Sequence, residues 1–349
     1  YEALTLSTYP LVTHKGTDEA RKAGRVYIGI LISTSISLLL LAILWTWEAT
    51  GTLSFVPGGT LAGNLHGPAV GLLLMLYAFG IGKAAMMPLH RWLPAAMVAP
   101  TPVSALLHAV AVVKAGVFSV VKVVVYVFGL DLLQIEPSTN WLLYAAGFTI
   151  LIASVIALRQ DNLKLRLAYS TISQLSYVIL AVAIFAPISA MGAALHIAAH
   201  AFGKITLFFA AGSIYTAAHK TEVSQLDGIG RRMPWTMGAF AVGALSMIGV
   251  PPAAGFLSKW YMLTGAWQTQ QVAAILIIIA STLLNAAYFM PVVYAAFFKP
   301  PPAGESRGAE HGEAPWTIVV ALVATAALTV LLFLFPDIPL QLAHQLVGE

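Results

Sequence analysis

The sequence has no cysteine and few charged residues, and both scarcities limit what the chain can do. Without cysteine its 349 residues can form no disulfide, hold no cysteine-ligated iron–sulfur cluster and supply no thiolate nucleophile. We therefore expect no cofactor and no redox centre on this chain. Only 9% of the residues are charged and 59% are hydrophobic, which excludes a soluble globular domain. The net charge of +4 comes from scattered basic residues, so we expect no nucleic-acid partner.

Long apolar runs predict an all-α polytopic membrane protein in a lipid bilayer. A hydrocarbon core about 30 Å thick needs about 20 helical residues, and about ten segments of the sequence approach or exceed that length. The expected spans are 1–13, 24–47, 69–98, 102–128, 138–158, 168–186, 189–217, 234–266, 271–298 and 315–336.

The first of these spans is too short to cross a bilayer, because thirteen residues at about 1.5 Å each reach only about 20 Å. The sequence also begins without an initiator Met and without a signal peptide. We therefore expect earlier helices to be missing or to belong to another polypeptide.

The basic residues alternate from loop to loop in step with these spans. Lys and Arg occur at Arg91 and in loops 14–25, 159–166, 219–232 and 299–307. The loops between contain neither residue, namely 48–68, 129–137, 187–188, 267–270 and 337–349. By the positive-inside rule we expect the basic loops to be cytoplasmic, in a bacterial or archaeal inner (cell) membrane.

Proline interrupts two spans at depth, and each interrupted span carries a lysine. One break follows Lys83 at Pro88, and the other precedes Lys259 at Pro251 and Pro252. A freed backbone carbonyl is tolerated in a membrane only where protein or a wet cavity satisfies it. Either break alone would be an ordinary proline kink, but a pair with lysines favours a transporter with its site at two discontinuous helices.

The two breaks lie five spans apart and have their lysines in mirrored order, which predicts inverted five-helix repeats. We expect a first repeat at 1–128, truncated at its N-terminus, and a second at 138–298. Residues 299–314 read as a flexible cytoplasmic linker, and 315–349 as an extra C-terminal helix.

Three ionisable side chains form a stripe on one predicted helix. His196, His200 and Lys204 follow one another at intervals of four, which puts them on one helix face. A zinc site is excluded because residues 197–199 contain no acid and Lys204 would repel a cation. Since histidine titrates near neutrality, the stripe favours a proton relay with water over a metal site.

Other ionisable residues extend this pattern, with some alternatives open. His108 and Lys114 are six residues apart and face different sides of a regular helix, so only one need face the path. Lys164 and Arg166 open a helix at the cytoplasmic edge, where either a relay role or a topological role fits Lys164.

Glu2 is the acid expected at membrane depth. Paired with Lys83 it would stay ionised, and separating the pair would drive the lysine's proton onward. Asp161, Glu222 and Asp227 lie in loops, where solvated charge is the expected role.

Several motifs resemble the antiporter-like subunits of respiratory complex I and of Mrp-type multisubunit cation/proton antiporters. The matching segments are Gly82–Pro94, Ala99–His108, Arg159–Lys164, Ala168–Gln174, His196–Lys204 and Gly249–Lys259. The opening residues 1–17 look more like Mrp-type or hydrogenase-associated members than like the terminal member in complex I. The chain departs from the family by lacking its first four helices and the long lateral helix of some members.

The resemblance implies two half-channels joined by a central hydrophilic axis, beside further antiporter-like membrane subunits. It assigns a proton relay to Glu2, Lys83, His108 or Lys114, Lys164, His196, His200, Lys204 and Lys259. Protons, with Na⁺ or K⁺ as a further possibility, would be the cargo.

The leading hypothesis is thus a proton-translocating subunit, coupled either to cation antiport or to redox chemistry in partner subunits. Only in the second case would the assembly be an enzyme, a translocase. The alternative is a structural membrane subunit of the same kind of complex that does not conduct. A stand-alone small-molecule transporter is disfavoured because Trp and Tyr mostly lie near span ends.

Overall fold

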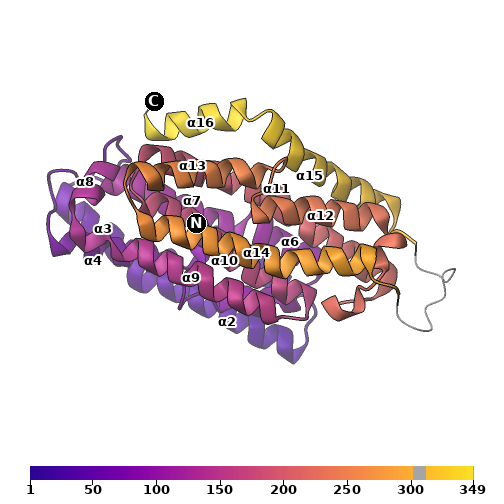
Figure 1. Ribbon diagram of the computed structural model, residues 1–349. Coiled ribbons are helices and arrows are strands. Elements are labelled where there is room, and N and C mark those ends of the chain that lie inside the picture. Colours follow the sequence, from indigo (N-terminus) through magenta and orange to yellow (C-terminus); the bar gives the residue numbers. More distant parts are fainter. Residues whose placement is uncertain (302–311, 349) are drawn as a thin grey trace.

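The protein is a bundle of helices (Figure 1), seen in a computed structural model that describes residues 1–301 and 312–348. These two ranges contain no strand of a sheet, only an isolated bridge between Asn162 and Glu222. The predicted all-α membrane fold is therefore confirmed.

Seven helices of the described chain are long and apolar enough to cross a membrane. They run over Asp18–Thr50, Thr101–Phe128, Pro137–Arg159, Leu163–Ala183, Pro187–Ala218, Val272–Phe298 and Trp316–Leu334. Two shorter apolar helices, α4 (Pro68–Gly80) and α12 (Pro234–Ile248), begin the discontinuous spans. With α1 (Glu2–Val12), these elements account for each of the predicted spans.

The remaining α-helices are α2 (Asp18–Thr34), α3 (Leu40–Thr50), α5 (Trp92–Ala95), α6 (Thr101–Ala105), α7 (Val112–Lys122), α8 (Leu130–Ile135), α9 (Trp141–Arg159), α10 (Leu163–Ala183), α11 (Pro187–Ala218), α13 (Ala254–Gln268), α14 (Val272–Phe298), α15 (Trp316–Leu334) and α16 (Asp337–Val347). Short 3₁₀ turns η2 (Gly82–Ala84) and η3 (Ala96–Val98) and a π-helical turn η4 (Leu106–Val110) lie between them.

Helix α11 packs against α10, α12, α13 and α15, so its stripe of ionisable residues faces other helices. The helices of the bundle lie lengthwise side by side, and α12 and α13 follow one another along its length (Figure 1). The N-terminus lies midway along that length in the same view, which places Glu2 far from both ends of the bundle.

Side-chain caps fix where two helices begin on the side with the basic loops. The Thr17 hydroxyl accepts the Ala20 N–H at 3.2 Å at the start of α2, beside the acidic Asp18. Asn162 caps α10 in the same way, accepting the Leu165 N–H at 3.1 Å.

Both predicted helix breaks are present. After α4 the chain makes the turn η2, which carries Lys83, and it resumes as α5 beyond Pro88. Helix α12 ends at Gly249, whose φ of 86° is left-handed, and α13 starts after Pro251 and Pro252.

Two glycines let a helix approach each break closely. A Cβ at Gly116 of α7 would lie 2.4 Å from backbone atoms of Lys83 and Ala84. A Cβ at Gly255 of α13 would lie 1.8 Å from the Ser246 carbonyl oxygen. No side chain fits either gap, so these glycines set the position of both breaks and of the lysines beside them.

The C-terminal segment differs from the expected loop at 337–349, because it forms the helix α16. Pro336 ends the transmembrane helix α15, since proline cannot continue its hydrogen-bond pattern. Helix α16 then packs through Ala343 on Met191 and Leu195 of α11. The bundle therefore covers α16 around Ala343, while Ile338 and Leu342 stay exposed.

Most of the predicted linker 299–314, namely 302–311, lies outside the described residues. Near its end, the Glu313 carboxylate accepts the backbone N–H groups of Trp235 at 2.7 Å and Thr236 at 3.2 Å. It also accepts the Thr236 hydroxyl at 2.5 Å. Glu313 thus satisfies free N–H groups at the start of α12.

Candidate functional site

Six lysine and histidine side chains are enclosed by the bundle, and they form the centre of the candidate site. Their exposed fraction is 0% except for Lys259, at 4%, and they are Lys83, His108, His196, His200, Lys204 and Lys259. Charge in such surroundings is costly unless polar partners surround it, so the partners of each group are decisive.

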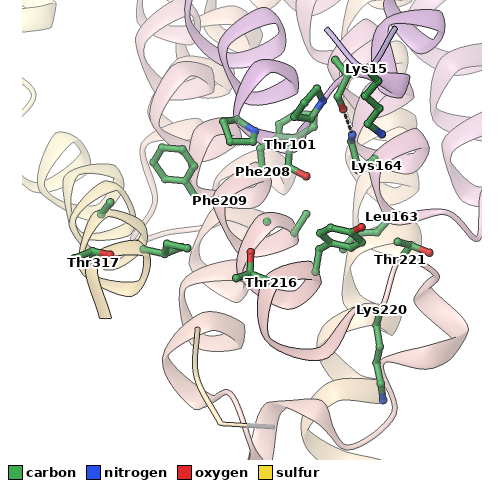
Figure 2. Close-up of a pocket in the computed structure, with 18 residues that line it drawn as sticks. Lys15, Thr101, Leu163, Lys164, Phe208, Phe209, Thr216, Lys220, Thr221 and Thr317 are labelled. Atoms are coloured by element: carbon green, nitrogen blue, oxygen red, sulfur yellow. Dashed lines mark hydrogen bonds between the residues drawn. The ribbon is translucent and has the colours of Figure 1, made fainter. Parts of the chain in front are cut away.

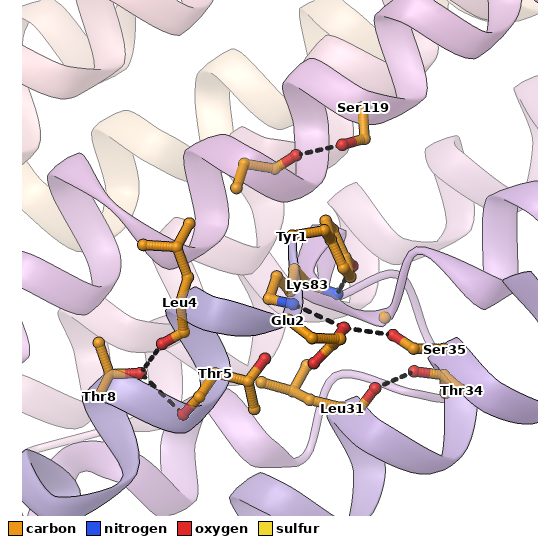
Figure 3. Close-up of polar contacts among 12 residues, drawn as sticks. Tyr1, Glu2, Leu4, Thr5, Thr8, Leu31, Thr34, Ser35, Lys83 and Ser119 are labelled. Atoms are coloured by element: carbon orange, nitrogen blue, oxygen red, sulfur yellow. Dashed lines mark hydrogen bonds and ion pairs between the residues drawn. The ribbon is translucent and has the colours of Figure 1, made fainter.

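The first group is an ion pair between the start of α1 and the turn η2 (Figure 3). Lys83 Nζ lies 2.9 Å from Glu2 Oε1, and Ser35 Oγ donates to the same oxygen at 2.5 Å. The Lys83 ammonium also lies 3.2 Å from the centre of the Tyr1 ring. The structure therefore brings together the pair expected from the sequence and adds Tyr1 and Ser35 to it.

The second group joins α7 to the histidine stripe of α11. Lys114 Nζ and His200 Nδ1 are hydrogen-bonded at 2.8 Å. His200 in turn lies beside His196, with ring centres 6.3 Å apart. Of the two alternatives left open on this span, Lys114 is the one with a direct bond to the stripe.

His108 is also inside the bundle rather than on a face turned away from it. Its ring lies 5.1 Å from that of Phe208, and neither ring nitrogen has a hydrogen-bond partner within the described chain. His108 lies within the π-helical turn η4 and Lys114 on the following helix α7, so the face assignment from regular helix spacing does not hold here.

The stripe on α11 contacts neighbouring helices on two sides. His196 Nδ1 is hydrogen-bonded to Ser258 Oγ of α13 at 2.8 Å, next to Lys259 in sequence. Lys204 Nζ donates to Ser170 Oγ of α10. The Nε2 atoms of His196 and His200 have no hydrogen-bond partner in residues 1–301 and 312–348, so each ring offers a second site for a proton.

Lys259 caps the end of the half-helix α12. Its Nζ donates to the Ile248 carbonyl at 2.8 Å, the Met247 carbonyl at 3.3 Å and Thr282 Oγ1 at 3.2 Å. These carbonyls are free because α12 stops at the break, so a cation is favourable there.

Lys164 also bonds backbone carbonyls, but at the end of the first broken span rather than at its break. Its Nζ donates to the carbonyls of Met97 at 2.8 Å and Ala99 at 2.7 Å, just before α6 begins. The neighbouring Arg166 is buried and donates to the carbonyls of Gln160 and Tyr288, so its role is more than a charge that sets topology.

A cavity of about 720 Å³ opens beside Lys164 (Figure 2). Lys15 and Lys164 lie together at one end of it, with Lys220 farther along. Most of its other lining residues come from α6, α11 and α15 and include Phe208, Phe209 and Tyr215. All three lysines lie in or next to predicted basic loops, so the cavity faces that side of the bundle.

Asp161 lies in a loop on that side, as expected, and is held in place there. Ser224 donates to it from its hydroxyl at 2.7 Å and its N–H at 2.9 Å. These bonds lower the pKa of the Asp161 carboxyl below its ordinary value.

Several polar residues of the site were missed by the sequence reasoning. On α10, Ser170, Gln174 and Tyr177 are buried on one face, and Gln174 and Asn285 both donate to the Met247 carbonyl at 3.3 Å. Their spacing of three and four on an apolar helix was the signal available. Three or more His, Cys, Asp or Glu side chains do not converge as a metal site anywhere in the described residues.

Known proteins resemble this chain over most of its length. Residues 1–285 match the family described as NADH:quinone oxidoreductase/Mrp antiporter, TM. NADH-quinone oxidoreductase subunit N of Desulforudis audaxviator is 35% identical over 268 residues, which cover 76% of this chain and 52% of that protein. The chain spans about half or less of the length of the curated relatives it matches.

Solved structures share the fold. A chain of the Mrp complex from a Dietzia species superposes with a TM-score of 0.85 at 22% identity, over 98% of this chain and 72% of that one. A chain of the archaeal membrane-bound sulfane sulfur reductase superposes with a TM-score of 0.83 at 26% identity, over 99% and 70%. Because the family match covers residues 1–285, this chain belongs to the NADH:quinone oxidoreductase/Mrp antiporter transmembrane family.

Proposed function

We propose that the chain is a proton-translocating membrane subunit of a multisubunit complex and that protons move along its buried Glu, Lys and His side chains. The observation that carries this proposal is the hydrogen bond of 2.8 Å between Lys114 and His200. Lys114 lies in the predicted first repeat, 1–128, and His200 in the second, 138–298. A contact between titratable groups of the two repeats is what a continuous relay requires.

The observed contacts support an order for the relay. Glu2 and Lys83 form its first station, and Lys114 connects to His200. No hydrogen bond joins Lys83 to Lys114 in the described chain, so water would bridge that step.

The second half of the relay continues from the histidines. His200 lies beside His196, which bonds Ser258 next to Lys259. We infer a branch from Lys204 through His108 to Lys164, because the His108 ring packs on Phe208, and Phe208 and Lys164 line the same cavity on the basic side. We infer that this cavity is the cytoplasmic entrance for protons.

We infer that the coupling belongs to partner subunits. The relatives are a subunit of a quinone oxidoreductase, an Mrp complex and a sulfane sulfur reductase, so both redox chemistry and antiport of Na⁺ or K⁺ are consistent with the family. Since this chain has no cysteine, iron–sulfur centres ligated by cysteine would lie on other chains, and further antiporter-like subunits would lie beside it. Copurifying iron–sulfur subunits would indicate the redox form.

The second candidate is a subunit that supports assembly without conducting. The observation that favours conduction is that Lys114 bonds to another titratable side chain, His200, rather than to an acid. Purely structural buried cations are normally paired with carboxylates.

The test replaces Lys114 by Gln in the intact assembly and measures proton movement in reconstituted vesicles. Conduction predicts a loss of at least about 100-fold, the usual contribution of a proton-transferring group. Lys122→Gln is the matched control, because Lys122 lies on the same helix but contacts the Phe55 ring outside the relay. Unchanged proton movement in Lys114→Gln, in an assembly of normal composition, would favour the structural alternative.

A further inference from the structure

The two lysines at the helix breaks share a feature that ion pairs and hydrogen bonds do not explain. Each ammonium lies over the face of a tyrosine ring, at 3.2 Å from the ring centre for Lys83 and Tyr1 and at 4.6 Å for Lys259 and Tyr177. Tyr1 immediately precedes α1, the first predicted span. Tyr177 lies on α10, the sixth predicted span. The tyrosines are thus five spans apart, as the lysines are, and the contact recurs once in each predicted repeat.

Neither tyrosine hydroxyl is bonded to the ammonium nitrogen, so the rings meet the ammonium groups with their faces. Tyr1 Oη accepts the backbone N–H of Lys83 at 3.2 Å. Tyr177 Oη is hydrogen-bonded to Ser281 Oγ of α14. An aromatic face attracts an ammonium group through its quadrupole, and the attraction is strongest where water is excluded.

The contact matters most for Lys259, because its other partners are neutral. They are two carbonyls and the Thr282 hydroxyl, whereas Lys83 has the Glu2 carboxylate. Tyr177 is fully buried, so little solvent screens the contact.

Tyr177 also lies between the histidine stripe and the terminal lysine. Its ring centre is 5.7 Å from that of His196, while its face meets Lys259. One ring thereby contacts both groups between which the proton would pass.

We propose that Tyr1 and Tyr177 are positioning residues whose ring faces hold the protonated lysines at the two breaks, with Tyr177 the more important. The proposal rests on the proposed relay. An aromatic face stabilises an ammonium group without accepting its proton in the working pH range. The lysine is therefore held in its charged form while its proton can leave only to a neighbouring acceptor or water.

The test varies the electron density of the ring at nearly constant size. Tyr177 is replaced in the intact assembly by Phe and then by phenylalanines with one, three and five fluorine atoms. Fluorine withdraws electrons from the ring, so each step weakens the attraction of its face for a cation. We expect Phe to keep proton movement within about twofold and the fully fluorinated ring to lose about tenfold, with intermediate steps between. The same fluorinated series at Phe128, which is buried against Tyr77 and has no lysine over its face among the described residues, should change nothing.

Equal rates across the Tyr177 series would overturn the proposal, because a ring that only fills space does not respond to its electron density. A Tyr177→Leu variant that assembles and pumps like the unmodified complex would overturn it as well. If the Leu variant does not assemble, the fluorinated series still decides.

A second readout separates this proposal from the relay itself. The ¹⁵N resonance of the Lys259 side chain, assigned by its loss in Lys259→Gln, reports the ammonium fraction without any transport. A fall of that fraction with fluorination supports the ring contact even if the vesicles show no proton movement, a result that would refute only the relay. No change in that fraction refutes the ring contact.

Discussion

Lys83 and Lys259 are two buried ammonium groups at helix breaks that are stabilised by different partners. Lys83 is paired with the Glu2 carboxylate at 2.9 Å. Lys259 is held by the carbonyls of Met247 and Ile248, which the break has freed. The charge of Lys83 is thus stabilised by a second titratable group, whereas the charge of Lys259 is stabilised by backbone carbonyls. We therefore expect Glu2 to govern the stability of the first break.

Replacing Glu2 by Gln leaves Lys83 enclosed without an acid, which should lower the free energy of unfolding by about 2 kcal/mol. The effect is smaller than for a fully buried pair because 32% of the Glu2 side chain is exposed. Thermal unfolding of the purified assembly measures it.

The double variant Glu2→Gln with Lys83→Met is the control for this experiment. It should regain most of the lost stability, because the unpaired charge is gone, but it should not regain proton movement. A single variant as stable as the unmodified protein would contradict the ion pair's role.

At the residue scale the sequence predicts which side chains are buried together better than it predicts their bonds. The pairing of Glu2 with Lys83 followed from one acid and one base at the same depth. The partners of Lys259 and Lys164 did not, because a proline shows where a helix breaks but not which carbonyls another side chain can reach. The choice between His108 and Lys114 could not be made from the sequence either, because no sequence signal marks the π-helical turn η4. The structure shows the bond of Lys114 to His200.

The elements that position the site are the two broken spans and the helices packed on them. Helix α7 presses Gly116 against the turn η2, and α13 brings Gly255 against the end of α12 at Ser246. In both places the backbone approaches too closely for any side chain. Each of these glycines therefore contributes to the geometry of its break.

Gly255→Ala should displace α13 from α12 and lower the free energy of unfolding by about 2–3 kcal/mol, the usual effect of overpacking. Its Cβ would lie 1.8 Å from the Ser246 carbonyl oxygen. The shift in the thermal unfolding midpoint of the purified assembly measures this effect.

Gly238→Ala on α12 is the matched control, because nothing lies within 4 Å of a Cβ there. It should be neutral or stabilising by up to about 1 kcal/mol, since alanine favours a helix. Equal midpoints for the two variants would show that the contact does not position the break.

At the element scale the sequence predicts the spans and both breaks, because length, hydropathy and proline act locally. Helix α16 was missed, because the absence of Lys and Arg from 337–349 fits a loop and a short helix equally well. The helix packs on Met191 and Leu195. Only tertiary packing distinguishes the two.

At the scale of the whole molecule, the proposed relay runs from Glu2 at the first break to Lys259 at the second, with a proposed branch to the cavity at Lys164. The all-α membrane fold and the family were predicted from the sequence, since long motifs and span lengths carry that information. The boundaries of the repeats, the sidedness of the loops and the identity of the partners stay predictions.

The most direct test of the account is proton movement by the intact assembly in vesicles after Lys204→Ala. Lys204 is fully buried on the stripe, where it contacts Ser170, and it does not hold either break. The account predicts normal assembly and a loss of proton movement of at least about 100-fold. Normal proton movement by Lys204→Ala would contradict it.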